Sequence, residues 1–151
     1  MRYFILFLLL LEITLAGNLE VSANSFYYKE GGQEAVFSGN VVVTQDQNKI
    51  TSNKITVLLD KKGEAKEYIA TGNVHFTLRS PKRYIIGKSY KLIYYPIEDK
   101  YILIGNVYIK DKLNDREVYG DEIIIDNKHG TSYAKSKGKK KVKFIFKVKS
   151  K

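Results

Sequence analysis

The sequence contains no cysteine, one methionine, two prolines and two histidines among its 151 residues. A chain without thiols forms no disulfide and is indifferent to the redox state of its compartment. His75 and His129 lie far apart in the sequence, and no cysteine could complete a ligand set with them, so we expect no metal site. No Ser/His/Asp set, phosphate-binding loop or nucleotide fingerprint is recognisable either, and we predict a protein that is not an enzyme and uses no cofactor.

Long apolar runs are also missing. The longest, residues 4–11, has eight residues, whereas a helix that crosses a bilayer needs about 20. Arg2 precedes this run and Thr14-Leu15-Ala16 follows it, which is typical of a cleaved secretory signal, and we place that signal at residues 1–17. Glu12 ends the run early and argues against a retained membrane anchor, which stays open as the alternative.

The charge is concentrated at one end. The formal net charge is +10 at pH 7, but nine of the 26 lysine and arginine residues lie within residues 135–151, which hold no acidic residue. The rest of the chain carries 17 basic and 16 acidic residues and is nearly neutral. Val142, Phe144, Phe146 and Val148 alternate with Lys143, Ile145, Lys147 and Lys149, so part of this tail predicts a strand with a lysine-rich face. Its lysines either protect a sheet edge or attract an anionic lipid, membrane surface or partner.

An internal repeat organises the body of the chain. The tripeptide Gly-Asn-Val occurs at residues 39–41, 72–74 and 105–107, at intervals of 33 residues. Each copy follows a β-prone stretch, and turn signals rich in Gly, Asn and Asp separate the strands. The chain also has 12 Tyr and 7 Phe and shows no helical period. We therefore predict one all-β domain, a solenoid-like roll of about three and a half stacked units.

Strand periodicity assigns an interior face. Two positions after each Gly-Asn are apolar in every copy, namely Val41, Val74 and Val107, then Val43, Phe76 and Ile109. The residues between them are mixed, which is typical of an antiparallel sheet with one buried face. A second strand repeats a small-x-x-apolar pattern at residues 52–57, 87–92 and 120–125. Adjacent Asp121 and Glu122 within it point to opposite faces, so we interpret them as a solvated strand start rather than paired catalytic carboxylates.

These elements resemble a known family, the periplasmic lipopolysaccharide-transport proteins of the LptA or OstA-like class. The resemblance rests on residues 23–28 (ANSFYY), on residues 37–43 (FSGNVVV), and on the recurrence of Gly-Asn-Val before a polar turn and a small-x-x-apolar strand. It covers about residues 19–130. The lysine-rich tail, residues 135–151, departs from the part that matches.

The resemblance implies a β-jellyroll at residues 18–134, with two facing antiparallel sheets splayed into a V. It also implies a periplasmic carrier that shelters the acyl chains of lipid A and bridges like-folded jellyroll domains of inner- and outer-membrane export components. Nucleic acid is not expected as a partner. The residues expected to contact lipid are the interior rows, Val41, Val43, Ile55, Val57, Val74, Phe76, Leu78, Tyr90, Leu92, Val107, Ile109, Ile123 and Ile125.

The two ends of a stacked roll leave unpaired strand edges, which pair with other chains unless they are blocked. We expect head-to-tail association through these edges, at Asn24, Phe26, Tyr28, Val142, Phe144 and Phe146. Two alternatives stay open: an inner-membrane-anchored relative with the same roll (LptC-like), and a structural solenoid with a filled core and no ligand. A polysaccharide-cleaving β-helix is disfavoured, because no cluster of carboxylates or basic catalytic groups is found.

Overall fold

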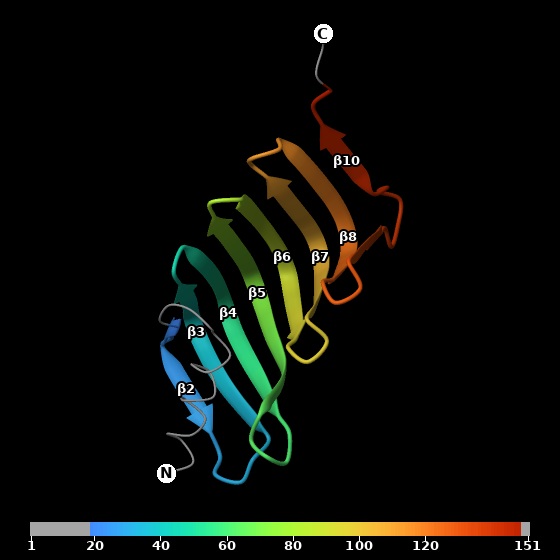
Figure 1. The fold of residues 1–151 in the computed structure, drawn as a ribbon. Coiled ribbons are helices and arrows are strands. Elements are labelled where there is room, and N and C mark those ends of the chain that lie inside the picture. The colour runs from blue at the N-terminus through green and yellow to red at the C-terminus, as the bar shows by residue number, and fades with distance from the viewer. Residues whose placement is uncertain (1–18, 149–151) are drawn as a thin grey trace.

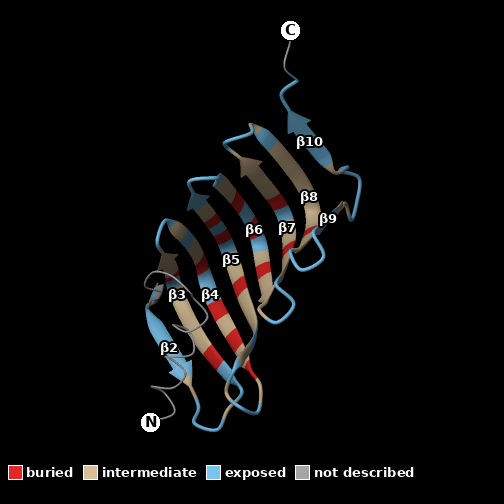
Figure 2. Cartoon of the chain, in the orientation of Figure 1, coloured by how far each residue is buried: buried red, intermediate tan, exposed pale blue. Residues whose placement is uncertain are grey.

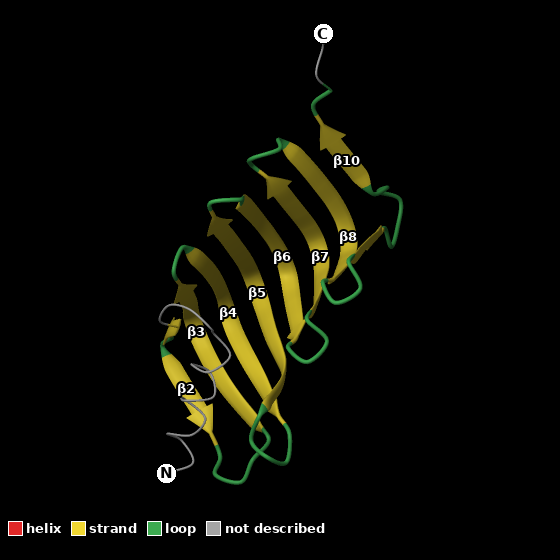
Figure 3. Cartoon of the chain, in the orientation of Figure 1, coloured by secondary structure: helices red, strands yellow, loops and turns green. Residues whose placement is uncertain are grey.

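The computed structural model describes residues 19–148 and confirms an all-β fold, with strands and loops but no helix in that range (Figure 3). Within those residues, therefore, nothing could cross a membrane as a helix. The secretory signal predicted at residues 1–17 lies outside the described residues. The strands are β1 (Leu19–Ser22), β2 (Ser25–Tyr28), β3 (Glu34–Gln45), β4 (Asn48–Leu59), β5 (Ala65–Ser80), β6 (Arg83–Tyr95), β7 (Lys100–Asp111), β8 (Arg116–Asp126), β9 (Thr131–Lys135) and β10 (Lys143–Phe146).

All strands belong to one antiparallel sheet in the order β1-β3-β4-β5-β6-β7-β8-β10, with β2 also on β3 and β9 also on β8. Figure 1 shows the long strands side by side in sequence order, from β3 near the N-terminus to β8. Short turns join them, at the places where Gly, Asn and Asp predicted turns. Because each strand pairs with its neighbour in sequence, the sheet grows by simple addition of hairpins.

The first and last strands are each split in two. β1 pairs with the C-terminal half of β3 and β2 with its N-terminal half, on either side of the Gly-Asn pair. At the other end, β9 pairs with the C-terminal half of β8 and β10 with its N-terminal half. The lysine-rich tail thus contributes a strand to the sheet. Figure 2 shows β2 and β10 as exposed edges that flank the buried positions of the central strands.

Each Gly-Asn pair creates a bulge at which the sheet is creased. The ladder shifts register between Ser38 and Val41, between Thr71 and Val74, and between Ile104 and Val107. The Gly and Asn in these gaps all have positive φ, from 46° to 87°. Two residues there face one on the neighbouring strand, which bends the strand locally. The crease divides one continuous sheet into two arms, and these arms are the predicted facing sheets of the V.

The crease also changes which residues of the even-numbered strands face inward. On β4, Ile50 and Ser52 face the interior before the crease, whereas Ile55 and Val57 do so after it. On β6 the change falls between Ser89, which is buried, and Leu92. The interior position predicted for Tyr90 is therefore wrong: its side chain is 65% exposed. Simple alternation placed Tyr90 on the face of Leu92, but the bulge at Gly105-Asn106 turns it outward.

The other predicted interior residues are confirmed in the core or packed against it. Val41, Ile55, Val57, Val74, Phe76, Leu92, Val107 and Ile123 are buried, and Val43, Leu78, Ile109 and Ile125 are half-buried against them.

Asp121 and Glu122 lie in the middle of β8 rather than at the start of a strand. Oδ2 of Asp121 accepts hydrogen bonds from the backbone N–H of Lys137 at 2.7 Å and from Oγ of Ser136 at 3.3 Å. Glu122 forms an ion pair with Lys135 at 3.0 Å. These contacts attach the end of β9, and the loop that follows it, to β8. The expectation of a merely solvated strand start is corrected accordingly.

Candidate functional site

The two arms of the creased sheet line one apolar groove, with a volume of about 460 Å³. One wall is formed by the half of each odd-numbered strand that follows its Gly-Asn pair and by the halves of the even-numbered strands that pair with it. The other wall is formed by the strand halves on the opposite side of the crease. The first wall includes Val43, Ile50, Phe76, Leu78, Ile85 and Ile109, and the second includes Leu92, Tyr101, Leu103 and Ile125. Since residues from both sides of the crease meet here, the groove lies inside the V.

The groove continues toward the C-terminal edge of the sheet. A second cavity of about 390 Å³ shares Ile85, Ile109 and Ile125 with the first and is otherwise lined by Asp111 of β7 and by residues of β8, β9 and β10. At its far end are Phe144 and Phe146, which are 62% and 61% exposed. An apolar surface therefore runs along the inside of the V from Val43 to the open edge at β10.

The predicted interior residues divide into two groups. Those that line the two cavities are Val43, Phe76, Leu78, Leu92, Ile109, Ile123 and Ile125. Val41, Val57, Val74 and Val107 are at most 2% exposed and belong to the buried core on the same face of the sheet. Ile55 lies in the core with them.

Sequence reasoning missed several groove residues, of which Tyr101 and Leu103 are the clearest. They stand four and two residues before Gly105, on the same face as Val107. Ala35 and Phe37 hold the same places before Gly39, and Tyr68 and Ala70 hold them before Gly72. Extending the apolar rows backward through Gly-Asn would have found them. Ile50 and Ile85 were missed because, on the even-numbered strands, the set of alternate residues that faces inward changes at the crease.

A row of tyrosines crosses the second wall. Tyr68, Tyr94 and Tyr101 are direct neighbours across β5, β6 and β7, with ring centroids 6.1 Å and 4.4 Å apart. The hydroxyl of Tyr94 donates to Oδ1 of Asp99 at 3.4 Å, whereas the buried hydroxyl of Tyr68 has no hydrogen-bond partner among the described residues. Burial raises the pKa of Tyr68 to about 12 and also raises those of Tyr94 and Tyr101. All three are neutral at pH 7.

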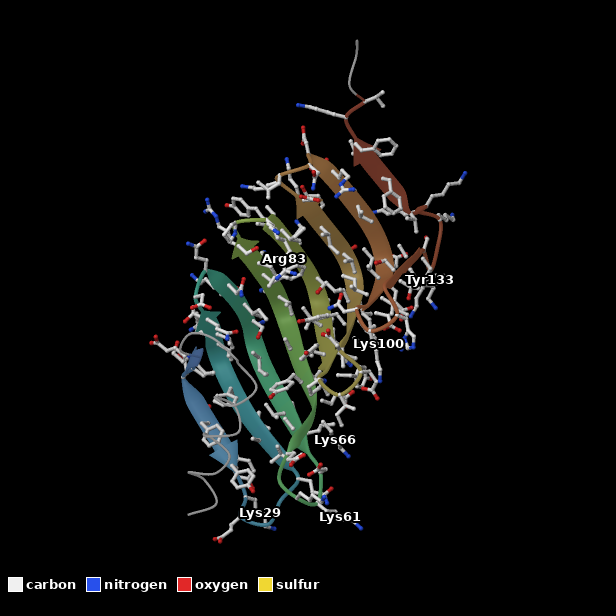
Figure 4. All side chains as sticks on the ribbon, viewed as in Figure 1. Lys29, Lys61, Lys66, Arg83, Lys100 and Tyr133 are labelled. Carbon is white, nitrogen blue, oxygen red and sulfur yellow. The ribbon has the colours of Figure 1, made fainter. Side chains whose placement is uncertain are left out.

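Polar and charged groups stand along the outer margin of the first wall. Asn48 and Arg83 line the groove there, and Figure 4 labels Arg83 near the turn between β5 and β6. Farther along, Oδ2 of Asp111 lies 2.7 Å from a guanidinium nitrogen of Arg116. Hydrogen bonds from Asn114 and from Arg116 lower the pKa of Asp111. The groove is thus apolar inside and charged at its mouth, which suits an amphiphile.

The histidines take no part in this groove. Nδ1 of His129 lies 2.9 Å from Oδ2 of Asp126, and Nδ1 of His75 lies 3.1 Å from the backbone oxygen of Asn73. Within residues 19–148, His, Asp and Glu form no group of three or more that could hold a metal ion. The geometry offers an apolar binding surface rather than a set of reacting groups.

The protein LptH of Pseudomonas aeruginosa is similar to this chain both in sequence and in structure. The lipopolysaccharide export system protein LptH of Pseudomonas aeruginosa is 28% identical over 111 residues, which cover 72% of this chain and 62% of that protein. This chain therefore matches less than two thirds of the relative's length. The crystal structure of LptH, described as the LptA-homologous periplasmic component of the lipopolysaccharide transport device of that organism, superposes with a TM-score of 0.73. That match has 20% identity and covers 87% of this chain and 96% of the solved one, and it shows the shared fold.

A family model gives the assignment. Residues 20–131 match the model described as LptA/(LptD N-terminal domain) LPS transport protein. The matched range begins in β1 and ends at the start of β9, so it spans the creased sheet and both walls of the groove. The chain belongs to the LptA/LptD N-terminal domain family of lipopolysaccharide transport proteins.

Proposed function

We propose that this protein is a periplasmic carrier that binds lipopolysaccharide by its acyl chains, without catalysing a reaction. The observation that carries the proposal is the continuous apolar surface inside the V, in a member of a family of lipopolysaccharide transport proteins. The similar protein LptH is described as a periplasmic component, which supports the compartment.

The physical need for such a groove follows from the cost of exposing acyl chains to water. Each methylene left in water costs about 0.8 kcal/mol, so a chain of about a dozen methylenes costs roughly 10 kcal/mol. Lipid A carries several such chains. Aliphatic and aromatic walls remove that cost for the part of each chain that they cover, and the charged mouth leaves the polar part of the lipid in contact with water and with side chains such as Arg83.

We assign lipid contact to the residues that line the cavities, above all Phe76, Leu92, Ile109 and Ile125. The fully buried valines of the interior rows have almost no surface to offer a ligand. In this proposal they stabilise the core of the sheet and do not contact the lipid. Tyr90 is outside the groove and is not among the proposed contacts.

The exposed edges support the proposal that like-folded domains extend the groove. β1 and β2 run opposite to β3, and β9 and β10 run opposite to β8, so a second jellyroll placed with its β1 and β2 against β9 and β10 continues the antiparallel alternation. Phe26 and Phe144 are exposed on the two edges, as proposed for joining residues. Asn24 instead packs at the crease against Gly39, and Val142 precedes β10.

Sedimentation velocity across a concentration series tests the self-association part of this proposal. We expect species larger than a monomer as the concentration rises, with β10 variants such as Phe144→Lys shifted toward the monomer. A single monomeric species at every concentration, in the wild-type chain, would remove the head-to-tail homo-oligomer and leave only partners with different sequences.

Photo-crosslinking tests the groove itself. The photoreactive residue benzoylphenylalanine replaces Phe76 in one purified protein and His75 in another, because these neighbours lie on opposite faces of β5 and His75 is exposed. We expect lipopolysaccharide to crosslink at position 76 and not at position 75. Equal crosslinking at both positions, or none at position 76, would favour the structural solenoid without a ligand.

A further inference from the structure

A third cavity lies outside the groove, at the C-terminal end of the crease. Its volume is about 740 Å³, and four lysines line it, Lys88 from β6, Lys140 and Lys141 from the loop between β9 and β10, and Lys143 from β10. Tyr108 and Tyr119 lie in its wall. None of these residues lines the apolar groove, since they occupy the opposite face of the sheet.

The loop that closes this cavity is fixed at both ends. The first part is held by Asp121, which accepts hydrogen bonds from Ser136 and Lys137. The backbone oxygen of Lys140 also contacts Oγ of Ser136, whose single proton it shares with Asp121. The loop ends where β10 pairs with β8, with Lys143 opposite Tyr119. These contacts bring Lys140 and Lys141 to the cavity in which Lys88 also lies.

The lysines of the cavity differ in their partners from two other lysines of the tail. Lys135 pairs with Glu122 at 3.0 Å, and Lys147 pairs with Asp115 at 2.9 Å, so these two attach the last strands to the sheet. Within residues 19–148, by contrast, none of the four cavity lysines forms an ion pair with a carboxylate. The ammonium of Lys143 instead lies 4.9 Å from the centroid of the Tyr119 ring.

The two acidic groups near the cavity already accept hydrogen bonds from other residues. Asp121 is the one carboxylate in its wall, and its Oδ2 accepts the two hydrogen bonds that hold the loop. Glu117 accepts a hydrogen bond from Tyr108 at 2.6 Å and lies 3.9 Å from Lys110. The cavity therefore gathers four positive charges against the single negative charge of Asp121, and a multivalent anion would relieve the repulsion among the lysines.

We propose that this cavity is a binding site for a phosphate-class anion, held by Lys88, Lys140, Lys141 and Lys143. Its concave shape suits a compact anion that several ammonium groups reach at once, and the ammonium groups supply point charges and rotatable donors that phosphate oxygens accept. The phosphate belongs either to a small soluble molecule or to a lipid headgroup. This site is independent of the proposed acyl-chain groove, because the two lie on opposite faces and share no lining residue.

Calorimetric titration of the full chain with inorganic pyrophosphate at low ionic strength tests the first source. Lys88→Gln and Lys141→Gln each remove one cavity charge, whereas Lys61→Gln removes one charge from the turn between β4 and β5, far from the tail (Figure 4). We expect saturable binding that each cavity variant weakens about threefold to tenfold and that Lys61→Gln leaves within about twofold of wild type. All three lysines are exposed, so the variants keep the fold.

Flotation with vesicles tests the second source, using phosphatidylcholine with or without phosphatidylglycerol. Binding to the anionic vesicles alone, lost in both cavity variants and kept in Lys61→Gln, assigns the site to a headgroup. Pyrophosphate binding with the same variant pattern assigns it to a soluble phosphate. The proposal is overturned if Lys61→Gln weakens binding as much as the cavity variants do, or if neither probe binds saturably. Neither result bears on lipid binding in the groove.

Discussion

The ring of Phe76 fills the space that a side chain on Gly87 would need. The two residues are direct partners across β5 and β6, and a Cβ placed on Gly87 would lie 2.2 Å from Cζ of Phe76. The phenyl ring therefore lies over the backbone of β6, where only glycine admits it. Phe76 is 8% exposed in this position and forms part of the groove wall.

Replacing Gly87 with Ala tests this packing. The new methyl group forces the Phe76 ring to move, and overpacking of this kind costs about 1–3 kcal/mol. We expect the free energy of unfolding to fall by that amount in urea denaturation. Gly120→Ala is the matched control, because a Cβ there meets nothing closer than 3.5 Å. In a Gly87→Ala background, Phe76→Leu should recover part of the loss, and a fully additive double variant would contradict the contact.

Gly87 also explains the main error of the sequence interpretation. The pattern matched Gly87 with Ser52 and Gly120 as the small residue of each second strand. In the structure it is Ser89 that corresponds to Ser52, since both are buried and their hydroxyls donate to the backbone oxygen two residues later, on Lys91 at 3.0 Å and Lys54 at 3.2 Å. The two-residue offset moved Tyr90 onto the interior face. The shared spacing Ser-x-Lys was the signal that would have corrected it.

Most of the interior was nevertheless predictable, because on the odd-numbered strands the same alternate positions face inward before and after the bulge. Val41 and Val43 face the same side as Ala35 and Phe37 before the crease. The fold class followed from the same repeat. The depth of the groove and the cavity under the tail loop were not predictable, since they depend on how far the crease bends the sheet and on contacts of Asp121 with residues 15 and 16 positions later.

The glycines of the crease lie against side chains of the segment that precedes their own strand. A Cβ on Gly39 would lie 2.9 Å from Cβ of Asn24, and one on Gly72 would lie 2.9 Å from Cβ of Asn53. A Cβ on Gly105 would lie 2.8 Å from that of Tyr90. Close approach and positive φ thus both require glycine at the crease, which accounts for its recurrence in every unit.

Gly72→Ala and Gly63→Ala separate these two requirements. Both glycines have nearly equal φ, +80° and +84°, but nothing lies within 4 Å of a Cβ on Gly63. Gly63→Ala should cost about 1–2 kcal/mol, the strain of a left-handed alanine. Gly72→Ala adds the clash with Asn53, for a total of about 3 kcal/mol. Equal losses in thermal or urea unfolding would show that close packing at the crease has no energetic weight.

Removal of the Tyr68 hydroxyl should raise the free energy of unfolding, in contrast to the glycine variants, which lower it. It is buried without a hydrogen-bond partner among the described residues, and a buried unsatisfied polar group costs about 1–3 kcal/mol. Tyr68→Phe keeps the ring against Tyr94 and removes that hydroxyl, so we expect the protein to become about 1 kcal/mol more stable. Tyr108→Phe is the contrasting variant, because it loses the 2.6 Å bond to Glu117 and should be destabilised. Urea unfolding of both at neutral pH measures the difference, and loss of stability in Tyr68→Phe would contradict this account.

The same tyrosines predict how stability falls in alkali. Burial raises the pKa of Tyr68 to about 12, from an ordinary value of 10 in the unfolded chain, so the folded state binds more protons than the unfolded state between these values. The stabilisation is complete below pH 10 and is lost as the pH rises through about 12. We expect the melting temperature to fall over this interval while absorbance at 295 nm reports tyrosinate forming together with unfolding. Tyr68→Phe lacks this group and should lose less stability over the same interval, and an unchanged pH dependence in that variant would show that other groups control the transition.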